Sequence, residues 1–287
     1  MPKLATSGRW TKRTLPRRTL FISFAASVVG GFGAFVAVGG TQGTPSRVAT
    51  LPQPSQRCGQ PDHPANTFGF RTADNVSLDG VEVGQGAKGV VLVHENGSRA
   101  LCGWWPYAVS LADGGFHVLL FDMRCSGLSG CPNNVRTGNH VADVAAAVTQ
   151  LRLRGAQIVE LVGASYGGSV AVVAAARLSR IAALVDLSGD ELGVKIGGVG
   201  RPISAARASR SVRLPVLFAV ARSDPYIPVS QERSLYRRTA SHAKTLLILP
   251  AGAGHGWDML IGSTGSGSWS GLADKLTAFI AKYAGAH

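Results

Sequence analysis

From residue 89 onward, short apolar runs recur along the sequence, and they constrain the fold more than any other feature. Each run is five or six residues long and rich in Val, Leu, Ile or Ala, and segments with helical spacing separate most of them. Continuous apolar strands that alternate with helices are typical of a mostly parallel sheet covered by helices on both faces. The runs span residues 89–94, 117–121, 157–162, 182–187, 216–221 and 244–249.

The segments around these runs complete the predicted fold. Residues 68–72 and 76–83 alternate apolar and polar side chains around Asp74-Asn75, which predicts an opening hairpin and brings the sheet to about eight strands. Residues 188–213 show neither strand nor helix spacing, and about 25 residues are few for a separate cap domain. We therefore expect an α/β fold without a large lid. Helices are expected at 106–112, 141–153, 169–178, 231–239 and 272–283.

Charge and hydropathy set the N-terminal part of the chain apart. The net charge is +13, but residues 1–57 hold eight basic residues and no acidic ones, so the remainder carries 21 basic against 16 acidic residues. Residues 20–38 are uncharged and mostly apolar and follow Arg17-Arg18, the pattern of an export signal or an uncleaved membrane anchor. Such a segment approaches the roughly 20 residues that a membrane-spanning helix needs.

These differences predict three parts of the chain. Residues 1–40 are expected to be an export signal or membrane anchor, and residues 41–64, rich in Pro, Gln, Ser and Gly, a linker. Residues 65–287 are expected to form one folded domain outside the cytoplasm, either secreted or held at a membrane through residues 20–38. No basic run interleaved with aromatic residues follows the N-terminal part, so we do not expect nucleic-acid binding.

All four cysteines follow the apolar segment, at positions 58, 102, 125 and 131. An even number in an exported chain favours disulfides, and four cysteines allow three connectivities. A bond between Cys125 and Cys131 would close a short loop and leave Cys58 to reach Cys102. Four free or partly free thiols are the alternative, and the spacing shows no zinc-binding pattern.

A serine surrounded by glycines interrupts the apolar stretch LVGASYGGSVAVVA at residues 161–174. The strand run at 157–162 precedes it, and an Ala-rich helical segment follows it. Between strand and helix, the pattern Gly-Ala-Ser165-Tyr-Gly is that of a nucleophile elbow, a tight turn that exposes the serine oxygen. The pattern is loose in a chain with 37 glycines, so its interpretation depends on partner residues elsewhere.

Two further residues supply those partners. A serine hydroxyl needs a base, usually a histidine, which a carboxylate orients. Asp224 follows the strand run at 216–221, and His255 follows the run at 244–249. The carboxyl ends of parallel strands lie at one edge of a sheet, so Ser165, Asp224 and His255 are predicted to meet there. Asp190, Glu191 and Asp258 are alternative acids.

In this order of nucleophile, acid and base, the chain resembles the α/β-hydrolase superfamily from about residue 68 to its end. Residues 122–129 are similar to the family's D-x-R-G-x-G-x-S loop, with Cys125 in place of the first Gly. The Ser-Tyr-Gly-Gly elbow and the Gly-His-Gly segment resemble dienelactone-hydrolase-like esterases and the catalytic domains of prolyl-oligopeptidase-type peptidases. The propeller domain of those peptidases is absent from the sequence, which favours the esterases.

The resemblance implies a role for each residue. Ser165 would attack an acyl carbon, His255 would take and return the proton, and Asp224 would orient the imidazole. The amide of Tyr166 and that of Glu95 or Asn96 would form the oxyanion hole. Glu95 stands where the family has Gly, and we consider three positions for it: paired with Arg124, helping to position the serine, or facing outward from the loop. No metal or cofactor is implied.

The remaining aromatic, basic and histidine residues have simpler interpretations. Trp104, Trp105 and Trp257 could line an acyl pocket but are as often core residues in such folds. A solvated face is the more frequent role for a basic set such as Lys195, Arg201, Arg207, Arg210 and Arg213. The other histidines lack a strand-end partner and are expected to be structural or solvated, namely His63, His117, His140, His242 and His287.

The sequence as a whole predicts an exported serine hydrolase that acts on small or medium acyl esters or lactones, with a small-molecule ester as its partner. A peptidase or acyltransferase with the same three residues is the first alternative. A non-catalytic, surface-tethered binding protein on the same scaffold is the second, although the intact set of nucleophile, acid and base argues against it.

Overall fold

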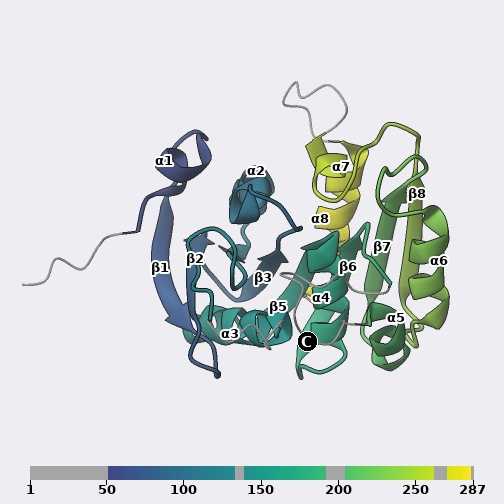
Figure 1. Ribbon diagram of the computed structural model, residues 1–287, viewed down its shortest axis with the longest axis horizontal. Coiled ribbons are helices and arrows are strands. Elements are labelled where there is room, and N and C mark those ends of the chain that lie inside the picture. Colours follow the sequence, from purple (N-terminus) through teal and green to yellow (C-terminus); the bar gives the residue numbers. More distant parts are fainter. Residues whose placement is uncertain (1–50, 133–138, 192–203, 262–269, 286–287) are drawn as a thin grey trace, which may run out of the picture. The chain divides into compact units, whose positions relative to one another are not determined.

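One eight-stranded sheet organises the computed structural model, which describes residues 51–132, 139–191, 204–261 and 270–285 (Figure 1). The strand order is β1-β2-β4-β3-β5-β6-β7-β8. Strand β2 is antiparallel to β1 and to β4, and the other neighbours are parallel. The predicted mostly parallel sheet with an opening hairpin is confirmed. The strands are β1 (Ala65–Arg71), β2 (Ser77–Val83), β3 (Lys88–Val93), β4 (His117–Phe121), β5 (Ile158–Ala164), β6 (Ile181–Leu187), β7 (Val216–Ala221) and β8 (Lys244–Leu249).

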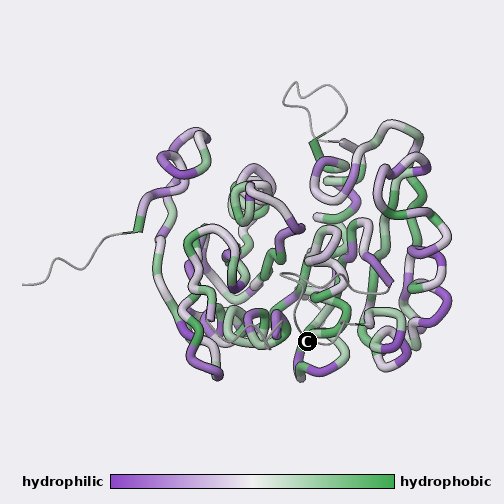
Figure 2. Tube along the Cα trace, viewed as in Figure 1, coloured by the Kyte–Doolittle hydropathy of each residue, from purple (hydrophilic) through white to green (hydrophobic). Residues whose placement is uncertain are grey.

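Helices cover both faces of this sheet, and each face has its own hydrophobic core. One core joins alternate strand residues such as Val91 and Leu161 to α3 (His140–Leu153), α4 (Tyr166–Ala175) and α6 (Val229–Arg238). The other joins Leu92 and Val162 to α2 (Trp105–Asp113), α7 (Asp258–Ile261) and α8 (Gly271–Tyr283). Hydrophobic residues accordingly follow the central strands (Figure 2). This two-sided burial explains why the strands are continuous apolar runs.

Two segments differ in detail from the sequence-based expectation. Helix α4 begins at Tyr166 rather than at residue 169, directly after the turn at Ser165. A short helix α5 (Ala205–Ala208) and the 3-10 turn η3 (Ser209–Ser211) lie in the stretch without periodicity. The described residues contain no separate lid domain, in agreement with the prediction.

The second half of the predicted linker is part of the folded unit, which spans Ala49–His287. Helix α1 (Pro54–Cys58) precedes β1, and a 3-10 turn, η1 (Ala100–Trp104), lies beside α1. No helix among the described residues is long and apolar enough to cross a membrane. The predicted signal or anchor at residues 20–38 lies outside the described residues.

Glu160 is a buried acid in the middle of β5, on the same face as Tyr107 of α2. Its side chain is 1% exposed, and neither carboxyl oxygen has a hydrogen-bond partner among the described residues. Burial raises the pKa of Glu160 to about 9. In the unfolded chain this carboxyl loses its proton near pH 4. Between pH 4 and pH 9 the folded state therefore binds more protons than the unfolded state, so the free energy of unfolding falls as the pH rises through this range.

Glu160→Met is therefore expected to stabilise the protein, and to do so more at pH 8 than at pH 5. A gain of about 1–2 kcal/mol at pH 8 is a conservative expectation, because one unit of pKa corresponds to about 1.4 kcal/mol. Urea unfolding at the two pH values measures the effect, with the exposed Asp62→Asn as control. A gain that is equal at both pH values would contradict a buried, protonated Glu160.

Candidate active site

Ser165 occupies a strained turn between β5 and α4. Its backbone has φ 51° and ψ −121°, in a region that residues with a side chain rarely adopt. Its N–H donates to the carbonyl of Leu187 at 2.8 Å, and its carbonyl accepts from the N–H of Ser169 at 3.1 Å. Neighbouring strand and helix thus hold the serine in this conformation, as a nucleophile elbow requires.

Glycines around the serine allow the backbone segments to approach one another. A Cβ on Gly163 would lie 2.3 Å from the carbonyl oxygen of Gly167, and one on Gly167 would lie 2.3 Å from that of His94. A Cβ on Gly168 would lie 2.0 Å from Oδ1 of the buried Asp186. No side chain fits at these positions without moving the backbone or a buried carboxyl, so the three glycines are a steric requirement of this turn.

The side chains of His255 and Asp224 form a hydrogen bond at the same edge of the sheet. The Nδ1–H of His255 lies 2.9 Å from both carboxyl oxygens of Asp224. Burial alone would raise the pKa of Asp224, but hydrogen bonds from His255 and from the N–H groups of Ile227 and Tyr226 hold it below its usual value. The ionised carboxylate therefore keeps the proton of His255 on Nδ1 and leaves Nε2 as the basic atom.

The loops that carry these three residues meet one another. Gly256, next to His255, packs against Ala164, next to Ser165: a Cβ on Gly256 would lie 3.3 Å from the Cβ of Ala164. The N–H of Gly256 also donates to the hydroxyl of Ser188, which follows β6, at 3.4 Å. The ring of Tyr226, near Asp224, packs edge-on against His255 with 4.8 Å between the ring centres.

Comparison with known proteins agrees with the observed fold. A family model described as alpha/beta hydrolase fold matches residues 90–196. An esterase of Pyrococcus furiosus is 20% identical, with a TM-score of 0.63, and the alignment covers 80% of this chain and 96% of the esterase. The chain has the α/β-hydrolase fold. No curated protein sequence matches it.

Two further solved structures share this α/β-hydrolase fold. A bacterial membrane phospholipase A is 15% identical, with a TM-score of 0.63 and coverage of 81% of this chain and 89% of that one. A monoacylglycerol lipase of Paleococcus ferrophilus is 16% identical, with a TM-score of 0.58 and coverage of 72% and 99%. At these identities the likeness describes the fold.

Among the described residues, the alternative acids have contacts with groups other than His255. The N–H of Glu191 donates to the side-chain oxygen of Gln231 at 3.4 Å. The backbone N–H and carbonyl of Asp190 both bond to the hydroxyl of Ser169, at 2.9 and 2.7 Å. Asp258 pairs with Arg99 at 2.9 Å. Asp224 is thus the carboxylate that contacts His255. The roles of Ser165, Asp224 and His255 in a reaction remain predictions.

The remaining histidines have other surroundings. His63 lies 3.2 Å from Asp113, His117 lies 2.5 Å from Glu82, and His140 lies 2.9 Å from the hydroxyl of Tyr166. His242 is exposed, and His287 lies outside the described residues. These contacts agree with the structural or solvated roles expected from the sequence.

The predicted oxyanion loop is held beside the elbow. His94 is buried at the end of β3, its Nε2 accepts the N–H of Met123 at 3.0 Å, and its Nδ1–H donates to the carbonyl of Glu95 at 2.6 Å. The close approach of Gly167 to the His94 carbonyl brings this loop to the start of α4. The structure therefore places Glu95 and Asn96 near Tyr166, and their function as amide donors stays a prediction.

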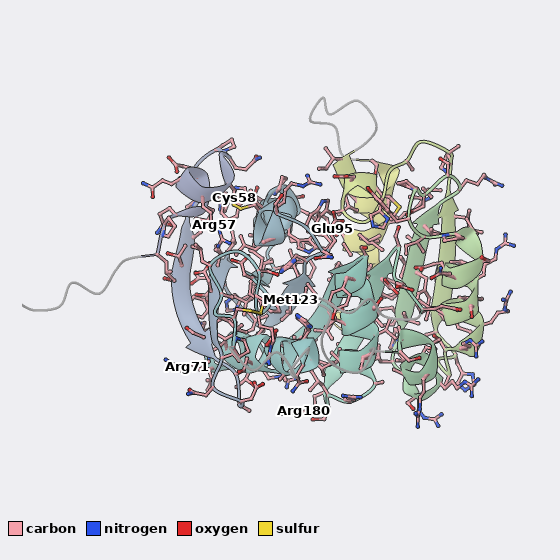
Figure 3. All side chains as sticks on the ribbon, viewed as in Figure 1. Arg57, Cys58, Arg71, Glu95, Met123 and Arg180 are labelled. Carbon is pink, nitrogen blue, oxygen red and sulfur yellow. A yellow bond between two sulfur atoms is a disulfide. The ribbon has the colours of Figure 1, made fainter. Side chains whose placement is uncertain are left out.

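The side chain of Glu95 neither faces outward nor pairs with Arg124, which were two of the three positions considered from the sequence. Arg124 instead pairs with Asp74 at 2.7 Å and with Asp143 at 2.7 Å. One carboxyl oxygen of Glu95 is buried, and a Cβ on Gly256 would lie 2.3 Å from it. Glu95 is labelled in Figure 3. Burial raises the pKa of Glu95 to about 7, an effect that the nearby His255 opposes.

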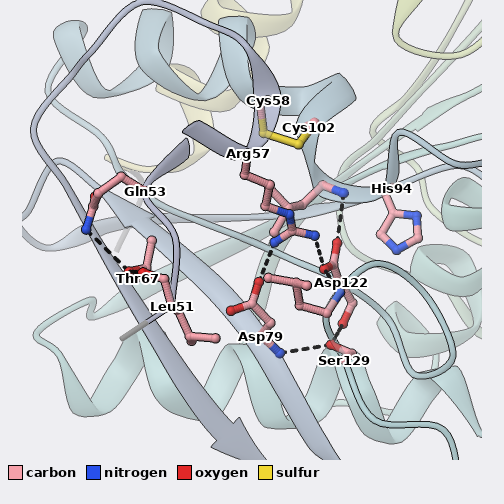
Figure 4. A network of polar contacts seen from close by, with 12 residues as sticks. Leu51, Gln53, Arg57, Cys58, Thr67, Asp79, His94, Cys102, Asp122 and Ser129 are labelled. Carbon is pink, nitrogen blue, oxygen red and sulfur yellow. Dashed lines mark hydrogen bonds and ion pairs between the residues drawn. A yellow bond between two sulfur atoms is a disulfide. The ribbon is translucent and has the colours of Figure 1, made fainter. Parts of the chain in front are cut away.

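A polar network that the sequence did not predict joins α1 to β2 and to the segment after β4 (Figure 4). Arg57, placed in the linker, forms ion pairs with Asp79 of β2 and with Asp122 after β4. Asp122 also accepts the N–H groups of Leu101, at 3.1 Å, and Leu128, at 2.8 Å. In the sequence, only the neighbouring Cys58 indicated that Arg57 lies against the domain, because a disulfide from Cys58 to Cys102 requires the segment around residue 57 to pack there.

Both favoured disulfides are present, Cys58–Cys102 and Cys125–Cys131. Cys125 has a positive φ of 62°, a conformation that its family counterpart Gly adopts more easily. The bond to Cys131 holds the loop in that conformation.

The three tryptophans are core residues. Trp104, Trp105 and Trp257 are at most 2% exposed. Within the predicted basic set, Arg207, Arg210 and Arg213 are exposed, as expected for a solvated face, whereas Lys195 and Arg201 lie outside the described residues.

Proposed function

We propose that this protein is a serine hydrolase that cleaves small or medium carboxylic esters or lactones through an acyl-enzyme on Ser165. The observation that carries the proposal is the strained Ser165 at the same sheet edge as the His255–Asp224 pair. The esterase, lipase and phospholipase in the names of proteins with this fold support ester hydrolysis over other reactions.

The geometry supports the following sequence of steps. Nε2 of His255 takes the proton of the Ser165 hydroxyl while its oxygen attacks the acyl carbon, and Asp224 stabilises the resulting imidazolium. The amide of Tyr166 and that of Glu95 or Asn96 donate to the oxyanion. The imidazolium returns the proton to the leaving alcohol. Water, deprotonated by the same nitrogen, then releases the acid and regenerates the serine.

We also propose that the protein is exported and works outside the cytoplasm. The two disulfides support this part of the proposal, because such bonds persist mainly in oxidising compartments. Sequencing of the mature N-terminus from cells tests it. A cleaved or membrane-held chain supports export, and an intact chain in the cytoplasm contradicts it.

A fluorophosphonate probe tests the assignment of the nucleophile. The probe is expected to label the wild-type protein once, and mass spectrometry of the digested protein should place the label on Ser165. Ester substrates of increasing acyl length, each with a matched amide, should show hydrolysis of esters over amides. Faster cleavage of the amides would favour a peptidase, and transfer of the acyl group to an added alcohol would favour an acyltransferase. Absence of both label and turnover would favour a binding protein.

A further inference from the structure

Three arginines line one pocket on the outer side of α6, away from the residues proposed for catalysis. The pocket has a volume of about 390 Å³ and lies between α6, the loop after β7 and the edge strand β8. No acidic residue lines it. Its lining consists of Arg222, Val229, Ser230, Arg233, Arg237 and Ile248.

The three arginines of the pocket form no ion pair with a described residue, in contrast to four other arginines of the protein. Arg57, Arg99, Arg124 and Arg154 each form an ion pair with at least one carboxylate. Arg222, Arg233 and Arg237 form none with any described residue, and all three are exposed. Three like charges around one pocket repel one another, so an anion in the pocket would be stabilised by all three.

The three arginines come from two elements that line the pocket, α6 and the loop after β7. Arg233 and Arg237 are four residues apart on α6, so they lie on the same helix face. Arg222 comes from the opposite wall, where its N–H bonds to the carbonyl of Leu249 in β8 at 3.0 Å. Ser230 adds a hydroxyl one turn before Arg233.

Two acids close to these elements in the sequence, Glu232 and Asp224, have other surroundings. Glu232 follows the opposite face of α6, is fully buried and lies near Asp186 and Asp224. Burial raises the pKa of Glu232 well above its usual value, which favours the uncharged form of this carboxyl. Asp224 is paired with His255.

We propose that this pocket binds a phosphate group. Guanidinium groups bind phosphate through paired, charge-assisted hydrogen bonds, and three of them from two walls match a tetrahedral anion better than a planar carboxylate. The pocket volume leaves room for a group esterified to the phosphate. The phosphate belongs either to a small soluble phosphate compound or to a phospholipid headgroup. This site is independent of the proposed ester hydrolysis.

Titration with inorganic phosphate at constant ionic strength, followed by calorimetry, tests the pocket. Wild-type protein is expected to bind phosphate saturably, and R222Q/R233Q/R237Q to bind it roughly 100-fold or more weakly, because each lost hydrogen bond to a charged group weakens binding several-fold. The single variant R233Q should fall between the two. The matched control is R177Q/R210Q/R213Q, which removes the same charge from exposed arginines elsewhere.

The control should retain affinity within about twofold of wild type. No saturable binding by the wild-type protein, or equal losses in both triple variants, overturns the proposal.

Vesicle flotation distinguishes the two sources of phosphate. With a headgroup as ligand, the wild type and the control triple float with phosphatidylglycerol vesicles, the pocket triple does not, and inorganic phosphate competes. With a soluble phosphate compound as ligand, inorganic phosphate binds as above and the wild type stays off the vesicles. Flotation of all three proteins to the same extent, with no phosphate competition, counts against the pocket.

Discussion

Replacing His255 by alanine is expected to lower kcat for ester hydrolysis by roughly four to six orders of magnitude, with little change in KM. Without the imidazole, Ser165 has no base to accept its proton, whereas the site that binds the ester is unchanged. Initial-rate kinetics on a short-chain ester measures the effect. Fluorophosphonate labelling of Ser165 should slow in parallel, because the probe depends on the same activated oxygen.

Asp224→Asn separates the acid from its alternatives. The asparagine can present its NH₂ group to Nδ1 and favour the wrong tautomer of His255, so a fall of about 10⁴-fold in kcat is expected. Asp258→Asn is the matched control, since the carboxyl of Asp258 pairs with Arg99 at the surface, and it should retain kcat within about threefold of wild type. Comparable losses in both variants, or a His255→Ala enzyme with near-normal kcat, would contradict the proposed roles.

The positions of the three candidate catalytic residues were predictable because each residue follows the end of a strand. The strand runs in the sequence located the carboxyl edge of the sheet, and Ser165, Asp224 and His255 each follow such a run within a few residues. The contact between His255 and Asp224 then follows from the pairing of β7 with β8. The order of strands in the sequence was enough to predict this contact, because parallel strands bring their carboxyl ends to one edge of the sheet whatever their side chains are.

Side-chain direction was not predictable in the same way. The sequence left three positions possible for the Glu95 side chain. The structure shows that one of its carboxyl oxygens is buried against Gly256. Glu160 and Asp186 look like ordinary charges within apolar runs, yet both are buried, and burial raises the pKa of Asp186 to about 8. These properties depend on which face a residue takes and on what packs there.

The ion pairs of Arg57 were not predicted for a different reason, which is the amino-acid composition of the segment around it. Residues rich in Pro, Gln and Ser predicted a linker, and nothing local distinguishes an arginine in solvent from one that contacts two acids across 22 and 65 residues. A disulfide at the neighbouring Cys58 ties this segment to Cys102 and makes the ion pairs local.

Arg57→Ala is expected to lower the free energy of unfolding by about 3–5 kcal/mol at pH 8, because it leaves two buried carboxyls without their cation. Asp79 and Asp122 are at most 4% exposed, and the guanidinium of Arg57 lies between them. Burial raises the pKa of Asp79 to about 6 even though Arg57 opposes the shift. Without the arginine the pKa rises further, so the folded state takes up a proton that the unfolded state lacks.

The loss caused by Arg57→Ala should therefore be smaller at pH 5 than at pH 8, since stability from a raised carboxyl pKa is present at low pH and disappears as the pH rises through the folded-state value. Urea unfolding at both pH values, with the disulfides intact, measures it. Arg71→Ala is the control, because Arg71 is exposed at the end of β1 and its side-chain hydrogen bonds among the described residues are to Asn75, and it should cost about 0.5 kcal/mol or less. If Arg57→Ala behaved like Arg71→Ala, or if its cost did not change with pH, the ion pairs would be surface contacts of little energetic weight, and the disulfide alone would hold this segment on the domain.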